Sequence, residues 1–157
     1  MGVHPWNNPT YAYRALRTLC DSGLGRMAGA HFLEMYRPYL PDGPLPEYFL
    51  MGEAQQDDPT GSHGWAAVPL VWLHDTVLGI RLAKPGGSEL LWQPRYVGWD
   101  KVSGRTMTPL GPCKVSIDWQ EKRASLQLPR GIVCCAKLGK SSWKLAGPGH
   151  QEIRWQS

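Results

Sequence analysis

The hydrophobic pattern of the chain changes at Lys84-Pro85-Gly86-Gly87, and this change limits the folds that the sequence can adopt. Before it, apolar residues recur at the three- and four-residue spacing of amphipathic helices. After it, short runs of alternating or β-branched residues are separated by turn residues, which is typical of strands. The sequence therefore predicts an α+β protein, with a helical part over 1–83 and an antiparallel β-sandwich over 84–157.

The helical part contains three segments with helical spacing. The first begins at Pro9, which suits the first position of a helix, and we expect it to end at Gly23 or Gly25. The second covers about 26–36, and the third runs over 65–80. On the second segment we expect Met27, Ala30, Phe32, Leu33 and Tyr36 to form the apolar face. Two helices joined by a short turn form a helical hairpin, which needs a partner for its apolar faces.

The β-rich part contains short runs separated by Gly and Pro turns. The expected strands are 89–93, 96–102, 104–108, 113–120, 124–128, 132–138 and 151–155. Strands of this length and spacing are typical of an antiparallel sandwich. We interpret Gly139-Lys140-Ser141 as a hairpin turn, because Cys134 replaces the glycine that a phosphate-binding loop needs five positions earlier.

Composition excludes some classes of protein. A hydrophobic content of 42% suffices for a core. The net charge of +4 comes from scattered basic residues, so no nucleic-acid partner is expected. No apolar run approaches the roughly 20 residues of a membrane span, and no signal peptide pattern is present. We therefore expect a cytoplasmic protein without a membrane partner, with its compartment unknown if the chain is a fragment of a longer protein.

Cysteine and histidine positions do not indicate a metal site. The four cysteines lack CxxC spacing, so we interpret them as reduced packing residues. If Cys134 and Cys135 lie on a strand, they point to opposite faces. His31 and His74 lie on helical segments and are interpreted as structural. We expect neither a metal nor a cofactor.

The chain has eight tryptophans but two phenylalanines. An indole ring matches the apolar face of a sugar, yet tryptophan is equally suited to a core or an interface. For any single tryptophan, the core interpretation is favoured over a sugar site.

A polar stretch at 52–69 is the best candidate for a functional site. It contains Glu53, paired aspartates at 57–58, His63 and Trp65, and it leads into an apolar helix. Ionisable residues on a loop between packed elements are typical of binding and catalysis. The alternative is that 57–61 forms a solvated turn and Ser62 caps the following helix. The residues alone leave both interpretations open.

Two groups of sequence runs, in this order and spacing, carry a family resemblance. The helical part has Gly-Glu-Ala at 52–54, Ser-His-Gly-Trp-Ala-Ala-Val-Pro at 62–69, Val-Leu-Gly-Ile-Arg at 77–81 and Lys-Pro-Gly at 84–86. The β-rich part has runs at 91–94, 104–111, 115–119, 128–131 and 147–150. The first group resembles the end of the catalytic barrel of bacterial α-L-rhamnosidases. The second resembles the β-sandwich that closes those enzymes, and even 9–39 looks like a helix pair of the barrel.

The resemblance implies the last part of an (α/α)₆ barrel, followed by an antiparallel β-sandwich. It also implies hydrolysis of terminal α-L-rhamnosides with inversion, which needs a general acid and a general base about 6.5–9.5 Å apart. Glu53 matches the family's base, with Glu47 as the fallback. His63 matches a ligand of the sugar hydroxyls, and Trp65 matches its aromatic neighbour.

The resemblance also implies that the chain is catalytically incomplete alone. The family's acid, an aspartate, and most of its sugar pocket belong to earlier barrel helices, which this sequence does not contain. Loss of acid catalysis typically costs about 10²–10⁴-fold in rate. We expect exposed apolar barrel faces over 9–40, which favour self-association or binding of the missing barrel portion.

Two alternatives stand beside this hypothesis of a glycoside hydrolase fragment. A carbohydrate-binding or accessory module would bind sugar without turnover, through Trp65, Trp92 or Trp99. A structural interaction protein would use its tryptophans only as core. The expected ligand is a rhamnose-containing glycoside or another carbohydrate.

Overall fold

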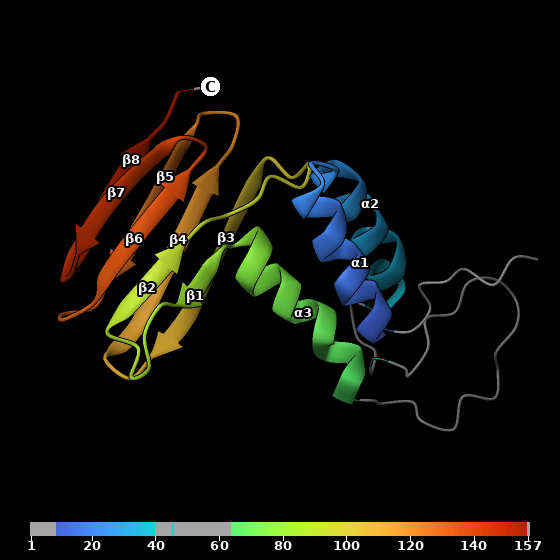
Figure 1. Ribbon diagram of the computed structural model, residues 1–157, viewed down its shortest axis with the longest axis horizontal. Coiled ribbons are helices and arrows are strands. Elements are labelled where there is room, and N and C mark those ends of the chain that lie inside the picture. The colour runs from blue at the N-terminus through green and yellow to red at the C-terminus, as the bar shows by residue number, and fades with distance from the viewer. Residues whose placement is uncertain (1–8, 40–44, 46–63, 157) are drawn as a thin grey trace, which may run out of the picture. The chain divides into compact units, whose positions relative to one another are not determined.

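The computed structural model describes residues 9–39, 45 and 64–156. The chain divides into two compact units, Met1–Leu73 and His74–Ser157. The first unit is helical and the second consists mainly of strands (Figure 1). The predicted α+β class, with helices first and an antiparallel-rich β-sandwich second, is confirmed. The finer assignment of domains to 1–83 and 84–157 stays a prediction.

Helix α1 (Pro9–Asp21) begins at the predicted proline and ends before Gly23, whose φ of +79° suits glycine. Its buried residues are Pro9, Ala12, Leu16 and Cys20, at helical spacing. Helix α2 (Gly25–Tyr36) packs against α1, and a short 3₁₀ helix (Arg37–Tyr39) follows. The predicted hairpin of helices is therefore present.

The buried face of α2 differs from the expected one. Met27 and Ala30 are exposed, whereas Ala28, Gly29 and Met35 are buried. Apolar residues occur on more than one side of this helix, so spacing alone does not select the face. Small residues at 25, 28 and 29 suit a close approach of two helix backbones, and the face that carries them is the buried one.

The segment after residue 64 is helical but irregular. It consists of a 3₁₀ turn η2 (Gly64–Ala67), the short helix α3 (Val68–Trp72) and a π-helical turn η3 (Leu73–Val77). Pro69 lies in the first turn of α3, where its missing N–H costs little. The predicted continuation to Ile80 is wrong. The chain leaves the helix before Gly79, where φ is +77° and an added Cβ would lie 2.3 Å from the backbone nitrogen of Pro94.

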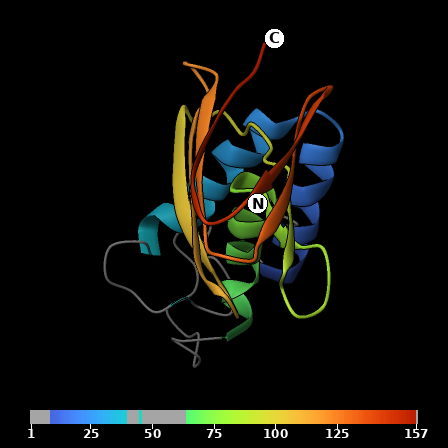
Figure 2. The same ribbon diagram turned by 90° about the vertical axis from the view of Figure 1, so that its left-hand side faces the viewer.

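Two four-stranded sheets form the second unit, with strand orders β1-β2-β6-β7 and β3-β4-β5-β8. Figure 2 shows them as separate layers. The strands are β1 (Ile80–Leu82), β2 (Glu89–Trp92), β3 (Lys101–Thr108), β4 (Gly111–Asp118), β5 (Arg123–Leu128), β6 (Val133–Leu138), β7 (Ser141–Ala146) and β8 (Gly149–Arg154). Every pairing is antiparallel except β2 with β6, which is parallel.

Two strand predictions needed correction. The runs 96–102 and 104–108 are not separate strands, because β3 continues through Gly104. A Cβ at Gly104 would lie 3.0 Å from Leu78 Cδ2, so glycine here makes room for a core side chain. The strands β1 and β7 were not predicted, although the turn at Gly139 and Lys140 that precedes β7 was.

The core of the second unit lies between the sheets. Leu90, Trp92, Ile117 and Leu126 are at most 1% exposed there. Trp92 Nε1 donates a hydrogen bond of 3.0 Å to the carbonyl oxygen of Leu78, so burial leaves this indole N–H satisfied.

The cysteines are free, as predicted. Cys134 is buried while its neighbour Cys135 is exposed, which confirms that they point to opposite faces of β6. Burial raises the pKa of the Cys113 thiol to about 11 and that of Cys134 to about 12. Both buried thiols therefore stay protonated and act as packing groups.

Candidate functional site

Of the site residues expected from the sequence, Trp65 lies within the described structure. The candidate base Glu53, its fallback Glu47 and the candidate sugar ligand His63 lie outside the described residues. Their roles stay predictions. The described part of the site is therefore the segment around Trp65 and the helices that hold it.

A hydrogen bond fixes the backbone next to Trp65. The hydroxyl of Tyr36, at the end of α2, donates to the carbonyl oxygen of Ala66 at 2.7 Å. Tyr36 and Ala66 are both 0% exposed, and burial raises the pKa of the Tyr36 phenol. The phenol therefore remains a neutral donor throughout the physiological range. This anchoring role of Tyr36 was not predicted, because nothing local in the sequence relates positions 36 and 66.

Aromatic stacking strengthens the same connection. The rings of Phe32 and Tyr36 have centroids 4.5 Å apart and an interplanar angle of 13°. Phe32 also stacks on Trp72 of α3, at 5.3 Å and 30°. Helix α2 thus holds the segment that follows Trp65 at two points, Ala66 and Trp72. The spacing of Phe32 and Tyr36, one helical turn apart, was the available signal for this contact.

The side chain of Trp65 is exposed although its neighbours are held. Trp65 is 69% exposed, while Ala66 and Trp72 are 0% exposed. A large apolar ring in water on a fixed backbone favours a binding role, since a flat indole face can stack on an apolar ligand face. An exposed indole ring in this position can bind the apolar face of a ligand.

The other described tryptophans differ from Trp65. Trp72 and Trp92 are fully buried, and Trp119, Trp143 and Trp155 pack partly against the sandwich core. The suggestion that Trp92 binds sugar is therefore wrong, because its ring lies inside the core. Trp99 is half-buried. Among the described tryptophans, Trp65 is the one with an exposed ring.

Apolar side chains are also exposed on the first two helices and their turn. Tyr11 is 62% exposed, Leu24 48% and Met27 49%. These residues lie within 9–40, where the resemblance to a barrel implies an apolar face. Whether that face self-associates or binds a further barrel portion stays a prediction.

The described residues hold no group of three or more His, Cys, Asp or Glu that could bind a metal ion. Within the same residues, no helix has the length and apolarity of a membrane span. Nδ1 of His31 lies 3.5 Å from a carboxylate oxygen of Glu34, one turn further along α2. This contact is consistent with the structural role expected for that histidine.

Comparison with known proteins finds similarity among solved structures. No protein-family model and no curated protein sequence matches the chain. Among solved structures, the fold is similar to that of the native α-L-rhamnosidase from Aspergillus terreus, with a TM-score of 0.52 and 20% sequence identity. The match covers 60% of this chain and 13% of that chain, so this chain spans a small part of the length of that protein. At this identity, the similarity shows a shared fold.

Proposed function

We propose that the chain is the C-terminal part of an α-L-rhamnosidase-like inverting glycoside hydrolase and is catalytically incomplete on its own. The observation that carries the proposal is the similarity in fold to an α-L-rhamnosidase over 60% of the chain. The order of the sequence runs at 52–86 and 91–150, which resemble those of α-L-rhamnosidases, is in line with this proposal.

The proposed roles follow the chemistry of inversion. Glu53 would activate water as the general base, and the acid would come from a part of the barrel outside this sequence. His63 would bind a sugar hydroxyl. Trp65 would stack on the apolar face of the sugar, and its exposed ring on a backbone held by Tyr36 supports that role.

Hydrolysis of a chromogenic α-L-rhamnoside tests the catalytic part of the proposal. We expect no turnover by the purified chain and none by its Glu53→Gln variant, because the general acid is missing. Turnover by the wild-type chain that disappears in Glu53→Gln would show a complete site and contradict the proposed incompleteness.

Calorimetric titration with L-rhamnose tests the binding part. We expect millimolar to micromolar binding that Trp65→Ala weakens by about fivefold, the loss of one stacking contact of roughly 1 kcal/mol. Val71→Ala, a truncation at a position that is 50% exposed in α3, is the matched control and should bind like the wild type. Equal binding by Trp65→Ala and the wild type would exclude Trp65 from the site.

A non-catalytic carbohydrate-binding module is the second candidate, favoured by the exposed Trp65 ring. A chimaera in which this chain replaces the matched segment of the Aspergillus terreus α-L-rhamnosidase separates the two. Glu53-dependent turnover by a folded chimaera supports the enzyme part. A chimaera that binds rhamnose through Trp65 but shows no dependence on Glu53 favours the module.

A further inference from the structure

The outer face of the β3-β4-β5-β8 sheet has an ordered arrangement of side chains. Strand register places Ser103 beside Ser116 and Ser116 beside Ser125, so these short hydroxyl side chains form a row across the strands. On one side of this row, Arg123 of β5 lies beside Arg154 of β8. On the other side, Arg105 of β3 lies beside Lys114 of β4. Basic side chains therefore flank a floor of serines.

This face is hollowed along the serine row. Two shallow hollows of about 320 and 480 Å³ share Ser116, Ser125 and His150 among their lining residues. Neighbouring rows on one face of a strand are about 7 Å apart, and three strands span about 10 Å across the sheet. The short serine side chains of β3, β4 and β5 lie between rows that carry long basic ones and make an open groove across these three strands, while Glu152 of β8 is the register partner of Ser125 at its end.

The positive charge of the groove is only partly neutralised. The Asp118 carboxylate has Lys101 Nζ at 3.6 Å and an Arg123 guanidinium nitrogen at 3.9 Å, and it accepts a 3.0 Å bond from the backbone N–H of Glu121. The bond from Glu121, with Lys101 and Arg123 beside it, holds the pKa of Asp118 below its usual range. This carboxylate is therefore ionised and already paired.

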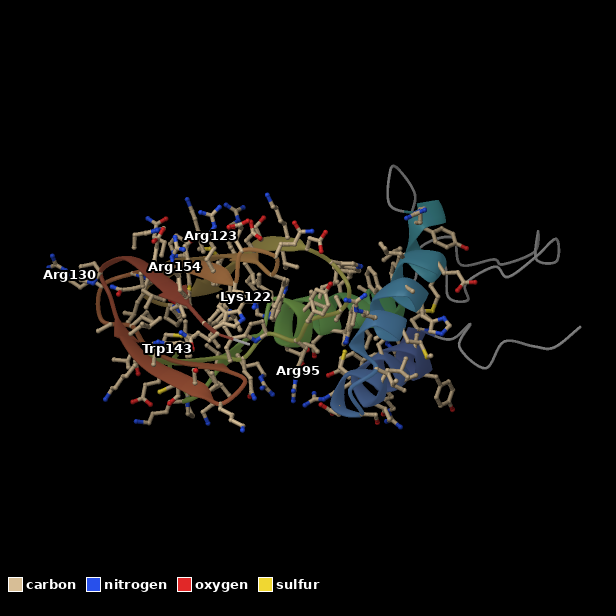
Figure 3. The ribbon with its side chains drawn as sticks, turned by 90° about the horizontal axis from the view of Figure 1, so that it is seen from above. Arg95, Lys122, Arg123, Arg130, Trp143 and Arg154 are labelled. Atoms are coloured by element: carbon tan, nitrogen blue, oxygen red, sulfur yellow. The ribbon has the colours of Figure 1, made fainter. Side chains whose placement is uncertain are left out.

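Further cations on this face remain available to a ligand. Within the described residues, Arg105, Lys114 and Arg154 form no ion pair, and all are exposed. Figure 3 labels Arg123 and Arg154, which are register partners on this face. The other carboxylate of the face, Glu152, lies 3.9 Å from His150 Nε2. The groove thus keeps an excess of positive charge in water.

We propose that this groove binds an acidic polysaccharide, a chain of sugars that carry carboxylate groups. Serine hydroxyls can both donate to and accept from sugar hydroxyls, and the flanking Arg and Lys side chains suit carboxylates. The choice of a carbohydrate rests on the proposed function, whereas the negative charge of the ligand follows from the groove itself.

A nucleic acid fits the same face less well. Single-stranded nucleic acids are bound by aromatic side chains on which bases stack, and the residues that line the hollows include no Trp, Tyr or Phe. A polymer with anionic groups and many hydroxyls, but without bases that need stacking partners, matches the groove better.

The test compares charge reversal on the two outer faces of the sandwich. Arg105→Glu with Lys114→Glu reverses the groove, and Lys137→Glu with Lys144→Glu makes the same change of charge at exposed positions of β6 and β7. Each full-length chain is titrated with polygalacturonate and with neutral dextran at low and physiological salt. Circular dichroism confirms that each variant is folded.

We expect the wild type to bind polygalacturonate and not dextran, more weakly at higher salt. Reversal in the groove should weaken binding by at least about tenfold, because like charges then face the ligand. The β6–β7 variant should bind within about twofold of the wild type. Ser116→Leu, which fills the shared floor without a change of charge, should weaken binding as well.

Several outcomes overturn the inference. These are no binding of polygalacturonate by the wild type, equal weakening by both reversals, and tighter binding of a single-stranded oligonucleotide than of polygalacturonate. Failure of the proposed function is separate, since L-rhamnose binding depends on Trp65 and not on the groove. Polygalacturonate binding that persists in a chain unable to bind rhamnose would support the groove while contradicting that function.

Discussion

The two units of the chain hold their polar and aromatic side chains by different means. In the helical unit, the stack of Phe32, Tyr36 and Trp72 joins segments that lie far apart in the sequence. In the sandwich, strand register repeats the same order of side chains from one strand to the next. A side chain on a helix is thus placed by a few long-range contacts, and one on a sheet by its neighbours in the ladder.

This difference affects how each unit responds to substitution. The sandwich has one continuous core between its sheets, so a large cavity there disturbs both sheets. The helical unit has a smaller set of buried contacts around Tyr36, and its Trp65 is 69% exposed. Substitutions in the two units should therefore differ in size and in what they disturb.

Trp92→Ala should give the largest effect. It removes a side chain that is 0% exposed and also removes the donor to the carbonyl oxygen of Leu78, so we expect a loss of about 3–5 kcal/mol in the free energy of unfolding. Urea denaturation measures it. Trp143→Ala, at a half-buried position of β7, should cost clearly less. Equal losses for both variants would contradict the central place of Trp92 in the core.

Tyr36→Phe should give an intermediate effect in the helical unit. It keeps the aromatic stack but leaves the buried carbonyl of Ala66 without its donor, which costs about 1–2 kcal/mol. Hydrogen exchange at 64–67 should rise more than exchange in the sandwich. Tyr13→Phe, which removes a hydroxyl that accepts from Arg17 at an exposed position, should cost less than about 0.5 kcal/mol.

Asp118→Asn should give a smaller effect that depends on pH. The folded-state pKa of Asp118 lies below its ordinary value of 3.8, so the ionised carboxylate stabilises the sandwich above that value. This contribution is lost as the pH falls from 3.8 through the lower folded pKa. Thermal denaturation should therefore show a less stable variant at pH 7 and converging curves in acid.

Asp100→Asn is the control for loss of one negative charge, since its carboxylate accepts from Gln120 at an exposed position. A difference between wild type and Asp118→Asn that grows as the pH falls would have the wrong sign for this interpretation.

Much of the sandwich was predictable because a strand's period of two assigns each residue to a face. The opposite orientations of Cys134 and Cys135 follow from that period alone. The parallel pairing of β2 with β6 was not predictable, because partner choice depends on the topology of the whole sheet. The serine row has the same origin. Its members are spread over 103–125 and become neighbours only through strand register.

The candidate site was predictable only in part. The resemblance pointed to Trp65, but no local pattern indicates that its ring is exposed while Trp92 is buried. The helix boundary at Val77 failed for a similar reason. Ile80 continues the helical spacing of apolar residues, yet it is buried because it lies in the sandwich core. Periodic spacing of apolar residues indicates which residues are buried. A helix and the strand that follows it can together produce one such pattern.

Met27→Ala should give the smallest effect, and it sharpens the comparison within one helix. Met27 and Met35 both lie on α2, but Met27 is 49% exposed and Met35 is 6% exposed. We expect Met27→Ala to change the free energy of unfolding by less than about 0.5 kcal/mol, since alanine also has the higher helix propensity. Met35→Ala should cost about 2–5 kcal/mol in the free energy of unfolding, because it leaves a cavity.

Urea denaturation of both variants decides which face of α2 is buried in solution. A larger loss for Met27→Ala than for Met35→Ala would instead support the buried face expected from spacing.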